Sequence, residues 1–242
     1  METRVAEVGD GIYQLMTYLE DMDFAVNQYL LTGEEPLLFH TGMRGLFPLV
    51  AEAVGRVTPV PSLRWISFGH VEADECGSMN EWLAAAPNAT VIHGPLGCMV
   101  SIGDMADRSP RALEPGEKLA IGDHCLEWIA TPHVPHAWEA GVLLDHSTRT
   151  LLCGDLFSRN GDYPPTTTDD IVGPASEAED GFPSMSLHPA SGSIIRDLAR
   201  HDVVALALMH GPVFTGDCSD ALEGLADDTE RRLMRARTRP IS

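Results

Sequence analysis

The residues best suited to chemistry are histidines and carboxylates gathered in one short segment. His70, Glu72, Asp74 and Glu75 fall within six residues, between a predicted strand and a predicted helix. A loop in that position can fold so that alternate side chains converge on one point, and imidazoles and carboxylates are common metal ligands. Because an acidic chain also produces such triplets by chance, the segment alone leaves a solvated loop open as an alternative.

Three later residues have the same context, at the end of an apolar strand. His136 lies in the loop after a predicted strand, and Asp155 and His210 each end one. Clefts at strand ends are where binding sites tend to be built. Taken alone, each histidine could be a loop residue bonded to the backbone, and the aspartate could cap a turn. Together with the first segment, the three residues predict one metal centre.

Apolar periodicity and turn residues predict the elements that must position these side chains. The predicted strands are 25–32, 36–40, 62–68, 89–93, 117–121, 124–131, 139–145, 150–153 and 203–209, and the predicted helices are 45–55, 78–86, 192–200 and 219–238. Residues 158–190 show no period and are rich in Pro, Asp, Gly, Ser and Thr, which predicts a long loop. Such a loop is either a functional lid over the site or a locally disordered segment.

Composition limits the class of protein. The 242 residues, 44% of them hydrophobic, predict one domain spanning residues 1–242. The net charge of −20 excludes nucleic acid and anionic membrane surfaces as main partners. Five scattered cysteines without a C-x-x-C pair are typical of reduced thiols, and there is no signal-like start or bilayer-length apolar run, so we expect a cytoplasmic protein.

The motifs resemble those of the metallo-β-lactamase superfamily and are most similar to the diiron domain of flavodiiron proteins and to stand-alone oxygen-binding diiron proteins. The matching segments lie between about residues 5 and 218 and are Asn27–Leu31, His70–Ser78, Thr131-Pro132 with His136, Cys153–Phe157 and His210–Phe214. The resemblance implies an α/β (α+β) fold, the four-layer αβ/βα sandwich. Two mixed β-sheets pack face to face with helices outside, and a binuclear site lies at the edge where strand ends meet.

The resemblance also implies a ligand set. It assigns His70, Glu72 and His136 to one metal, Asp74 and His210 to the other, and Asp155 as the bridge. Asp74 and Asp155 are therefore the candidate catalytic residues. Zinc hydrolases of the superfamily usually have His at the position of Glu72, and a carboxylate there suits iron or manganese better. We expect two metal ions, iron first, with manganese and zinc as alternatives.

Two positions depart from the family pattern. Glu75 stands where the family usually has His, so it either ligates the second metal or turns away and leaves a water or an open position. His133 and His136 both lie near the expected loop position, and His136 is chosen because it precedes Asp155 by 19 residues. We expect His133 to orient a ligand or to line the pocket. His40 is either a similar outer group or a core histidine.

The first functional hypothesis is a binuclear iron protein that binds or reduces dioxygen or nitric oxide. Flavodiiron proteins carry a flavodoxin domain, whereas this sequence shows no phosphate-cradling loop or dinucleotide fingerprint. We therefore expect no flavodoxin domain, no bound FMN and a separate electron-donor protein. The resemblance also suggests a homodimer.

A binuclear hydrolase is the main alternative. The same architecture can lower the pKa of a bridging water and polarise an ester, thioester or lactone carbonyl or a phosphodiester, with no electron donor. A non-catalytic diiron oxygen sensor is the third hypothesis.

Overall fold

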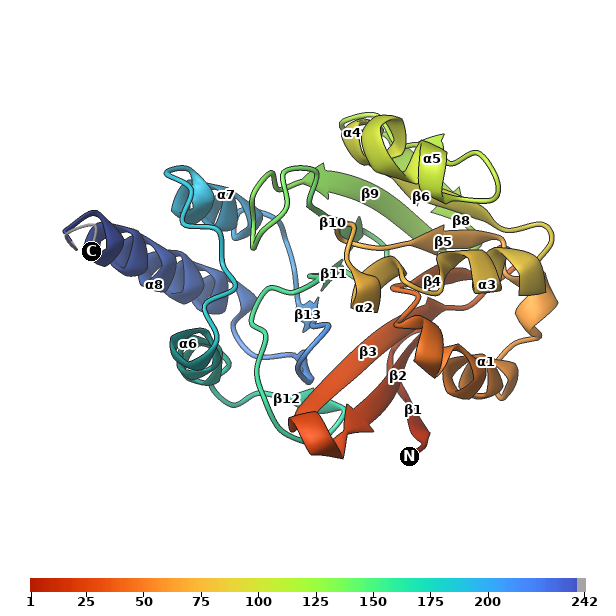
Figure 1. The fold of residues 1–242 in the computed structure, drawn as a ribbon, viewed down its shortest axis with the longest axis horizontal. Helices are drawn as coiled ribbons and strands as arrows, with labels where there is room; N and C mark the ends of the chain where they lie inside the picture. Colours follow the sequence, from red (N-terminus) through yellow and green to blue (C-terminus); the bar gives the residue numbers. More distant parts are fainter. Residues whose placement is uncertain (239–242) are drawn as a thin grey trace.

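The computed structural model describes residues 1–238, which form two seven-stranded sheets with helices outside them (Figure 1). The first sheet, in spatial order, contains β1 (Thr3–Gly9), β2 (Ile12–Leu19), β3 (Phe24–Leu31), β4 (Leu37–Phe39), β5 (Trp65–Ser67), β6 (Thr90–His93) and β7 (Arg111–Ala112). The second contains β12 (Thr166–Thr167), β14 (Val213–Phe214), β13 (Ala205–Ala207), β11 (Thr150–Leu152), β10 (Gly141–Asp145), β9 (His124–Ala130) and β8 (Lys118–Ile121). Both sheets mix parallel and antiparallel pairs, which confirms the predicted fold class.

Alternation along the strands sends side chains to both faces of each sheet, and both faces are covered. Tyr29, Phe39 and Trp65 of the first sheet share a buried cluster with Trp128 and Leu152 of the second. This cluster is the layer between the sheets. With this shared interior between the sheets and helices on each outer face, the molecule has four layers, helix, sheet, sheet and helix, as predicted.

Helices cover the two outer faces. Helices α1 and α3 pack against the first sheet and α6, α7 and α8 against the second (Figure 1). Their bounds, with those of the shorter helices, are α1 (Phe47–Gly55), α2 (Ala73–Cys76), α3 (Met79–Ala85), α4 (Pro95–Gly97), α5 (Gly103–Met105), α6 (Val172–Gly181), α7 (Ser191–Leu198) and α8 (Cys218–Thr238). Between residues 1 and 238 there is no helix with the length and apolar character needed to cross a bilayer.

The predicted loop at residues 158–190 is wrong in part, because it contains β12 and α6. The carboxylate of Asp170 accepts the backbone N–H of Val172 at 2.9 Å and so caps the start of α6. Only Ala175 and Glu179 of this helix are buried. A helix that buries so few side chains has no apolar stripe, which is why no period is visible in the sequence.

The parallel pair β11 and β13 sets the position of the site. Leu152 lies opposite Ala207, and the backbone N–H of Met209 donates to the carbonyl of Gly154 at 3.0 Å beyond the strands. The chain therefore leaves both strands at the same edge of the sheet. Asp155 and His210, which follow, are brought side by side by this register.

Candidate metal centre

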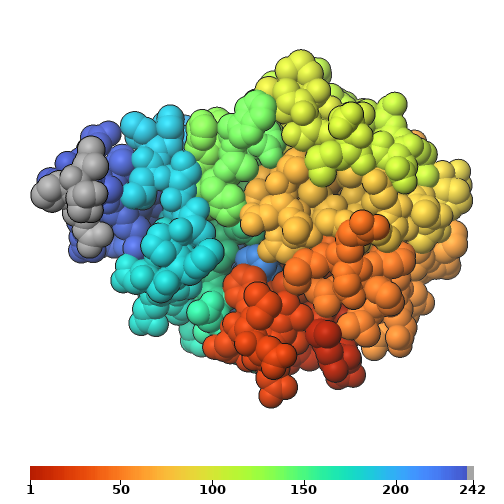
Figure 2. Space-filling view, in the orientation of Figure 1, coloured from red at the N-terminus to blue at the C-terminus, as the bar shows by residue number. Residues whose placement is uncertain are grey.

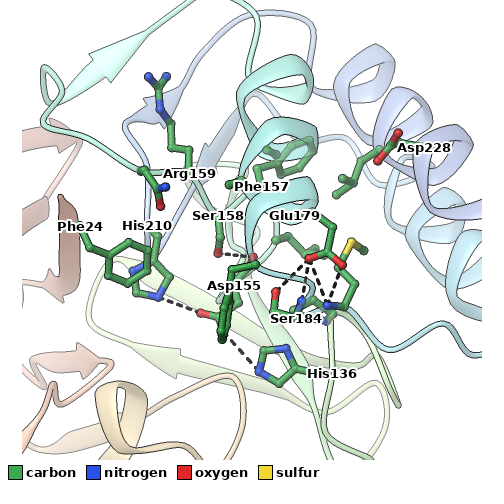
Figure 3. A pocket seen from close by; sticks show the side chains of 18 of the residues that line it. Phe24, His136, Asp155, Phe157, Ser158, Arg159, Glu179, Ser184, His210 and Asp228 are labelled. Atoms are coloured by element: carbon green, nitrogen blue, oxygen red, sulfur yellow. Dashed lines mark hydrogen bonds and ion pairs between the residues drawn. The ribbon is translucent and has the colours of Figure 1, made fainter. Parts of the chain in front are cut away.

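The centre forms where strand ends of the two sheets meet. His70 and Glu72 follow β5 in the loop before α2, Asp74 lies in the first turn of α2, and Asp155 and His210 follow β11 and β13. His136 comes from the loop between β9 and β10. Figure 3 shows His136, Asp155 and His210 pointing toward one another. The structure thus brings together six of the seven predicted ligands.

Four of these side chains form the first ligand group. The ligand atoms of His70, Glu72, His136 and Asp155 all lie within 4.8 Å of one another. Glu72 Oε2 is 2.8 Å from His70 Nε2 and 2.9 Å from His136 Nε2. Asp155 Oδ2 lies 3.8 and 3.5 Å from the same two nitrogens. Two imidazoles and two carboxylates therefore point at one small volume.

The second ligand group lies on the other side of Asp155. His210 Nε2 is 3.3 Å from Asp74 Oδ2 and 3.3 Å from Asp155 Oδ1. The opposite ring nitrogen, Nδ1, donates to the backbone carbonyl of Ala25 at 2.8 Å, and this bond keeps Nε2 directed at the carboxylates. Because one oxygen of Asp155 faces each group, its carboxylate lies between the two positions.

Mutual attraction between the histidines and carboxylates shifts their pKa values strongly. Burial lowers the pKa of His70 and of His210, but neighbouring carboxylates outweigh it and raise the pKa to about 12 for His70 and about 10 for His210. Hydrogen bonds from His136 and His70 lower the pKa of Glu72, and His210 lowers that of Asp155 to about 2 against the effect of burial. Protons on the imidazoles thus stabilise the negative charge of the carboxylates.

The donor set fits divalent metal ions in place of those protons. Three imidazoles and three carboxylates form a mixed sphere suited to iron, manganese or zinc. Oδ1 of Asp74 and Oδ1 of Asp155 are buried without a well-aligned hydrogen-bond partner. Oε1 of Glu75 and Oε2 of Glu139 also lack an aligned partner, so it is the convergence of Asp74 and Asp155 on the imidazoles, together with these unpartnered oxygens, that marks a place where a cation belongs.

Glu75 lies apart from both groups. Its side chain is fully buried, and Oε2 accepts the backbone N–H of His70 at 2.7 Å. Oε1 is 3.1 Å from His70 Nδ1, the ring nitrogen opposite the one that faces the cluster. His40, also fully buried, brings its Nε2 to 3.6 Å from the same oxygen.

His133 also lies outside the cluster. Its ring stacks on His188, with centroids 4.6 Å apart and planes 18° from parallel. It is absent from the residues that line the cavity described below. The contact joins the 132–138 loop to the 158–190 segment, and the backbone N–H of Ser186 reinforces it by donating to Pro135 at 2.6 Å.

A cavity of about 250 Å³ opens beside the two ligand groups. Glu72, Asp74, Asp155 and His210 contribute to its wall, and most of the remaining lining is apolar and comes from α6 and its surroundings, including Phe157, Ala175, Phe182 and Met185. In Figure 2, blue atoms from the C-terminal part of the chain are visible at a hollow between teal and orange surfaces. The centre is therefore reached through a pocket that α6 helps to close.

Sequence reasoning missed two residues that shape this pocket. The ring of Phe24 lies on His210 with centroids 4.1 Å apart. Glu179 accepts the backbone N–H groups of Ser184 and Met185 and so fixes the turn after α6 (Figure 3). Nothing in the sequence signals either role, since both depend on contacts between distant segments.

The fold and the ligand cluster define a protein of the metallo-β-lactamase-like class. The family model described as ODP family beta lactamase matches residues 24–183, more than half of the chain, so the chain belongs to that family. It is 25% identical over 202 residues to diflavin flavoprotein A 1 of Nostoc sp. (strain PCC 7120), an alignment that covers 81% of this chain. The chain spans 34% of that relative's length and 40% of the corresponding protein of Thermosynechococcus vestitus.

Solved structures agree on the fold. Rubredoxin oxygen:oxidoreductase from Desulfovibrio gigas superposes with a TM-score of 0.80 at 16% identity, covering 94% of this chain and 62% of that one. A metal-soaked Flv1 flavodiiron core from Synechocystis sp. PCC6803 gives 0.80 at 17% identity, covering 98% and 62%. Similarity at this level of identity establishes the architecture, the sandwich that the sequence motifs predicted.

Proposed function

We propose that this chain holds two adjacent iron ions and binds or reduces a small diatomic oxidant, dioxygen or nitric oxide. The observation that carries the proposal is the pair of ligand groups that share Asp155. The relatives support the choice of chemistry, because one is named an oxygen oxidoreductase and another a flavodiiron core. Manganese and zinc are the alternative occupants of the same donor set.

The predicted ligands fall into two sets, one for each metal ion. His70, Glu72 and His136, with one oxygen of Asp155, would hold the first ion, and Asp74, His210 and the other oxygen of Asp155 the second. Carboxylates of Glu72, Asp74 and Asp155 would offset the cationic charge, with Asp155 nearly buried and Glu72 half exposed. The Ala25 carbonyl and Glu75 fix the ring orientations of His210 and His70.

Adjacent reduced iron ions would supply the electrons that the oxidant takes up. The protein contributes a cavity of mixed apolar and polar lining that admits a small neutral molecule beside the ligand groups. We propose that a separate donor protein returns the electrons after each cycle.

Metal loading and oxygen response test the proposal together. Metal-free protein is reconstituted anaerobically with Fe²⁺, desalted, reduced and then exposed to dioxygen, with absorption spectra recorded at each step. We expect two irons per chain and a spectral change on exposure that an Asp155→Asn variant lacks. Iron bound at two per chain with no response to dioxygen or to nitric oxide would contradict the proposed chemistry.

A binuclear hydrolase is the second candidate, and the size of the cavity favours it. A volume of about 250 Å³ is larger than a diatomic molecule requires and accommodates an organic ester, thioester or lactone. In that case the carboxylates of Asp74 and Asp155 would position the attacking water. A substrate panel assayed with the Zn²⁺- and Mn²⁺-loaded protein tests this function, and turnover that disappears with Asp155→Asn would establish it.

A further inference from the structure

Glu75 is the residue of the H-x-E-x-D-E segment whose role the two ligand groups leave unexplained. It is a fully buried carboxylate, and such a group is costly unless it is paired. Its neighbours all lie behind the cluster: the backbone N–H of His70 donates to Oε2, and Oε1 has His70 Nδ1 at 3.1 Å and His40 Nε2 at 3.6 Å. None of the other predicted ligands is bonded to it.

The backbone holds Glu75 in this direction. Its own carbonyl accepts the backbone N–H of Thr41 at 2.6 Å and the Thr41 hydroxyl at 3.2 Å, which ties the start of α2 to the segment after β4. Outward rotation of the side chain would also take the carboxylate away from His40 Nε2, its buried neighbour at 3.6 Å.

Two glycines make room for the carboxylate. A Cβ at Gly69 would lie 3.1 Å from both oxygens of Glu75, and a Cβ at Gly154 would lie 3.2 Å from Oε1. Any other residue at either position would crowd the carboxylate, and Gly154 additionally has φ of +54°. The chain therefore encloses Glu75 against the Nδ1 edge of His70.

This placement determines which nitrogen of His70 is free. An Nδ1–H directed at a carboxylate leaves the lone pair on Nε2, the nitrogen that faces Glu72 and Asp155. Carboxylate partners of this kind orient a metal-bound histidine and raise its basicity.

We infer that Glu75 is a positioning residue for His70 and not a metal ligand, so that the first ion has four protein ligands and the second only three. The inference rests on the proposed metal centre but not on its reaction with oxygen. The second position, with Asp74, Asp155 and His210, would therefore leave more of an ion's coordination to molecules from outside the chain. An exogenous ligand would bind there.

Calorimetric titration of metal-free protein with Zn²⁺ tests the assignment. We expect two steps, the tighter at the four-ligand position, and His210→Gln should remove the weaker step and so identify it. Glu75→Gln should weaken the tighter step by about 10–100-fold and leave the weaker step within a few-fold. Loss of the weaker step alone, or no change in either, would overturn the inference.

Glu139→Gln is the matched control. Glu139 is also a buried glutamate beside this loop, where it accepts the backbone N–H of Val71 at 3.1 Å, but within residues 1–238 no hydrogen bond or ion pair joins it to the ring of His70. We expect both Zn²⁺ steps to be unchanged in this variant. A loss equal to that of Glu75→Gln would show that any buried charge near the loop matters, and would contradict a specific role for Glu75.

Histidine-ring NMR of the unsubstituted chain covers the case in which Glu75→Gln does not fold. In ¹⁵N-labelled, Zn²⁺-loaded protein, with His70 assigned, we expect a proton on Nδ1 and the metal-induced shift on Nε2. Metal on Nδ1 and the proton on Nε2 would overturn the inference. Because neither measurement uses dioxygen, both remain decisive if the protein proves to be a hydrolase.

Discussion

The strand ends of the second sheet form two opposite edges, and a histidine–aspartate pair lies at each; the two pairs differ in one respect. At one edge, Asp145 receives four hydrogen bonds, from His124, Cys125, Ser147 and Thr148, at 2.7–3.2 Å. At the other edge, Oδ1 of Asp155 has no aligned partner although His210 Nε2 lies 3.3 Å away.

The comparison separates a structural pair from a metal site. Asp145 is satisfied by backbone N–H groups and a hydroxyl, so a cation has nothing left to bind. Asp155 is surrounded by further carboxylates and imidazoles instead, and its remaining charge is compensated only by protons on histidines. Residue types do not distinguish the two pairs, whereas the hydrogen bonds around the carboxylate do.

Substitution of the two aspartates gives the largest contrast. Asp155→Asn should release both ions, since this carboxylate faces both ligand groups, and the loss of affinity should exceed the roughly 10–100-fold that an outer partner costs. Asp145→Asn should keep both ions and lower the free energy of unfolding by about 1–3 kcal/mol. Metal analysis and denaturant unfolding check both outcomes. Retention of two ions by the Asp155 variant would contradict the assignment of Asp155 as a metal ligand and of Asp145 as a structural residue.

Substitution of the two histidines should give a smaller contrast. His210→Gln removes a ligand from the second group only, so we expect one ion per chain to remain. His124→Gln should leave two ions bound and reduce stability. Metal content after dialysis against a weak chelator checks both variants, and equal metal loss in the two would contradict the assignment.

The pH dependence of stability should separate the metal-free from the loaded protein. The pKa of His210 is raised from 6.5 to about 10 in the folded state, so its contribution is fully present below pH 6.5 and is lost as the pH rises toward 10. Metal-free protein should therefore lose thermal stability over this range, while metal binding, which displaces protons, should strengthen with pH. Thermal unfolding of both forms checks this, and parallel curves would count against proton-for-metal exchange.

Thr148→Ala should have the smallest effect. It removes one of the four donors to Asp145 and should cost about 0.5–1.5 kcal/mol of stability, with metal content unchanged. Chemical denaturation and metal analysis measure the two quantities. A change in metal content would show that the two edges of the sheet are coupled.

Features of the fold that depend on local sequence patterns could be predicted. Apolar runs predicted most of the strands and hence the edge where Asp155 and His210 meet, and the family resemblance supplied the layered fold. Helix α6 was missed because it buries too little to show a period. The hairpin of β1 and β2 was not predicted either.

The direction of individual side chains could not be read from the sequence. Glu75 was left open between a ligand of the second metal and a residue that turns away from it, and its position depends on contacts with Thr41, Gly69 and Gly154 that only the fold creates. His133 was expected beside a ligand or in the pocket, whereas it lies against His188. Such contacts come from tertiary packing, which residue spacing does not encode.

The most direct test of the central claim is the metal content of the chain after anaerobic reconstitution with Fe²⁺ and removal of excess metal. Shared ligation by Asp155 predicts two irons per chain in the unsubstituted protein and none in Asp155→Asn, with Asp145→Asn retaining both. One iron or fewer in the unsubstituted protein, or two in Asp155→Asn, would contradict a binuclear centre built on this carboxylate.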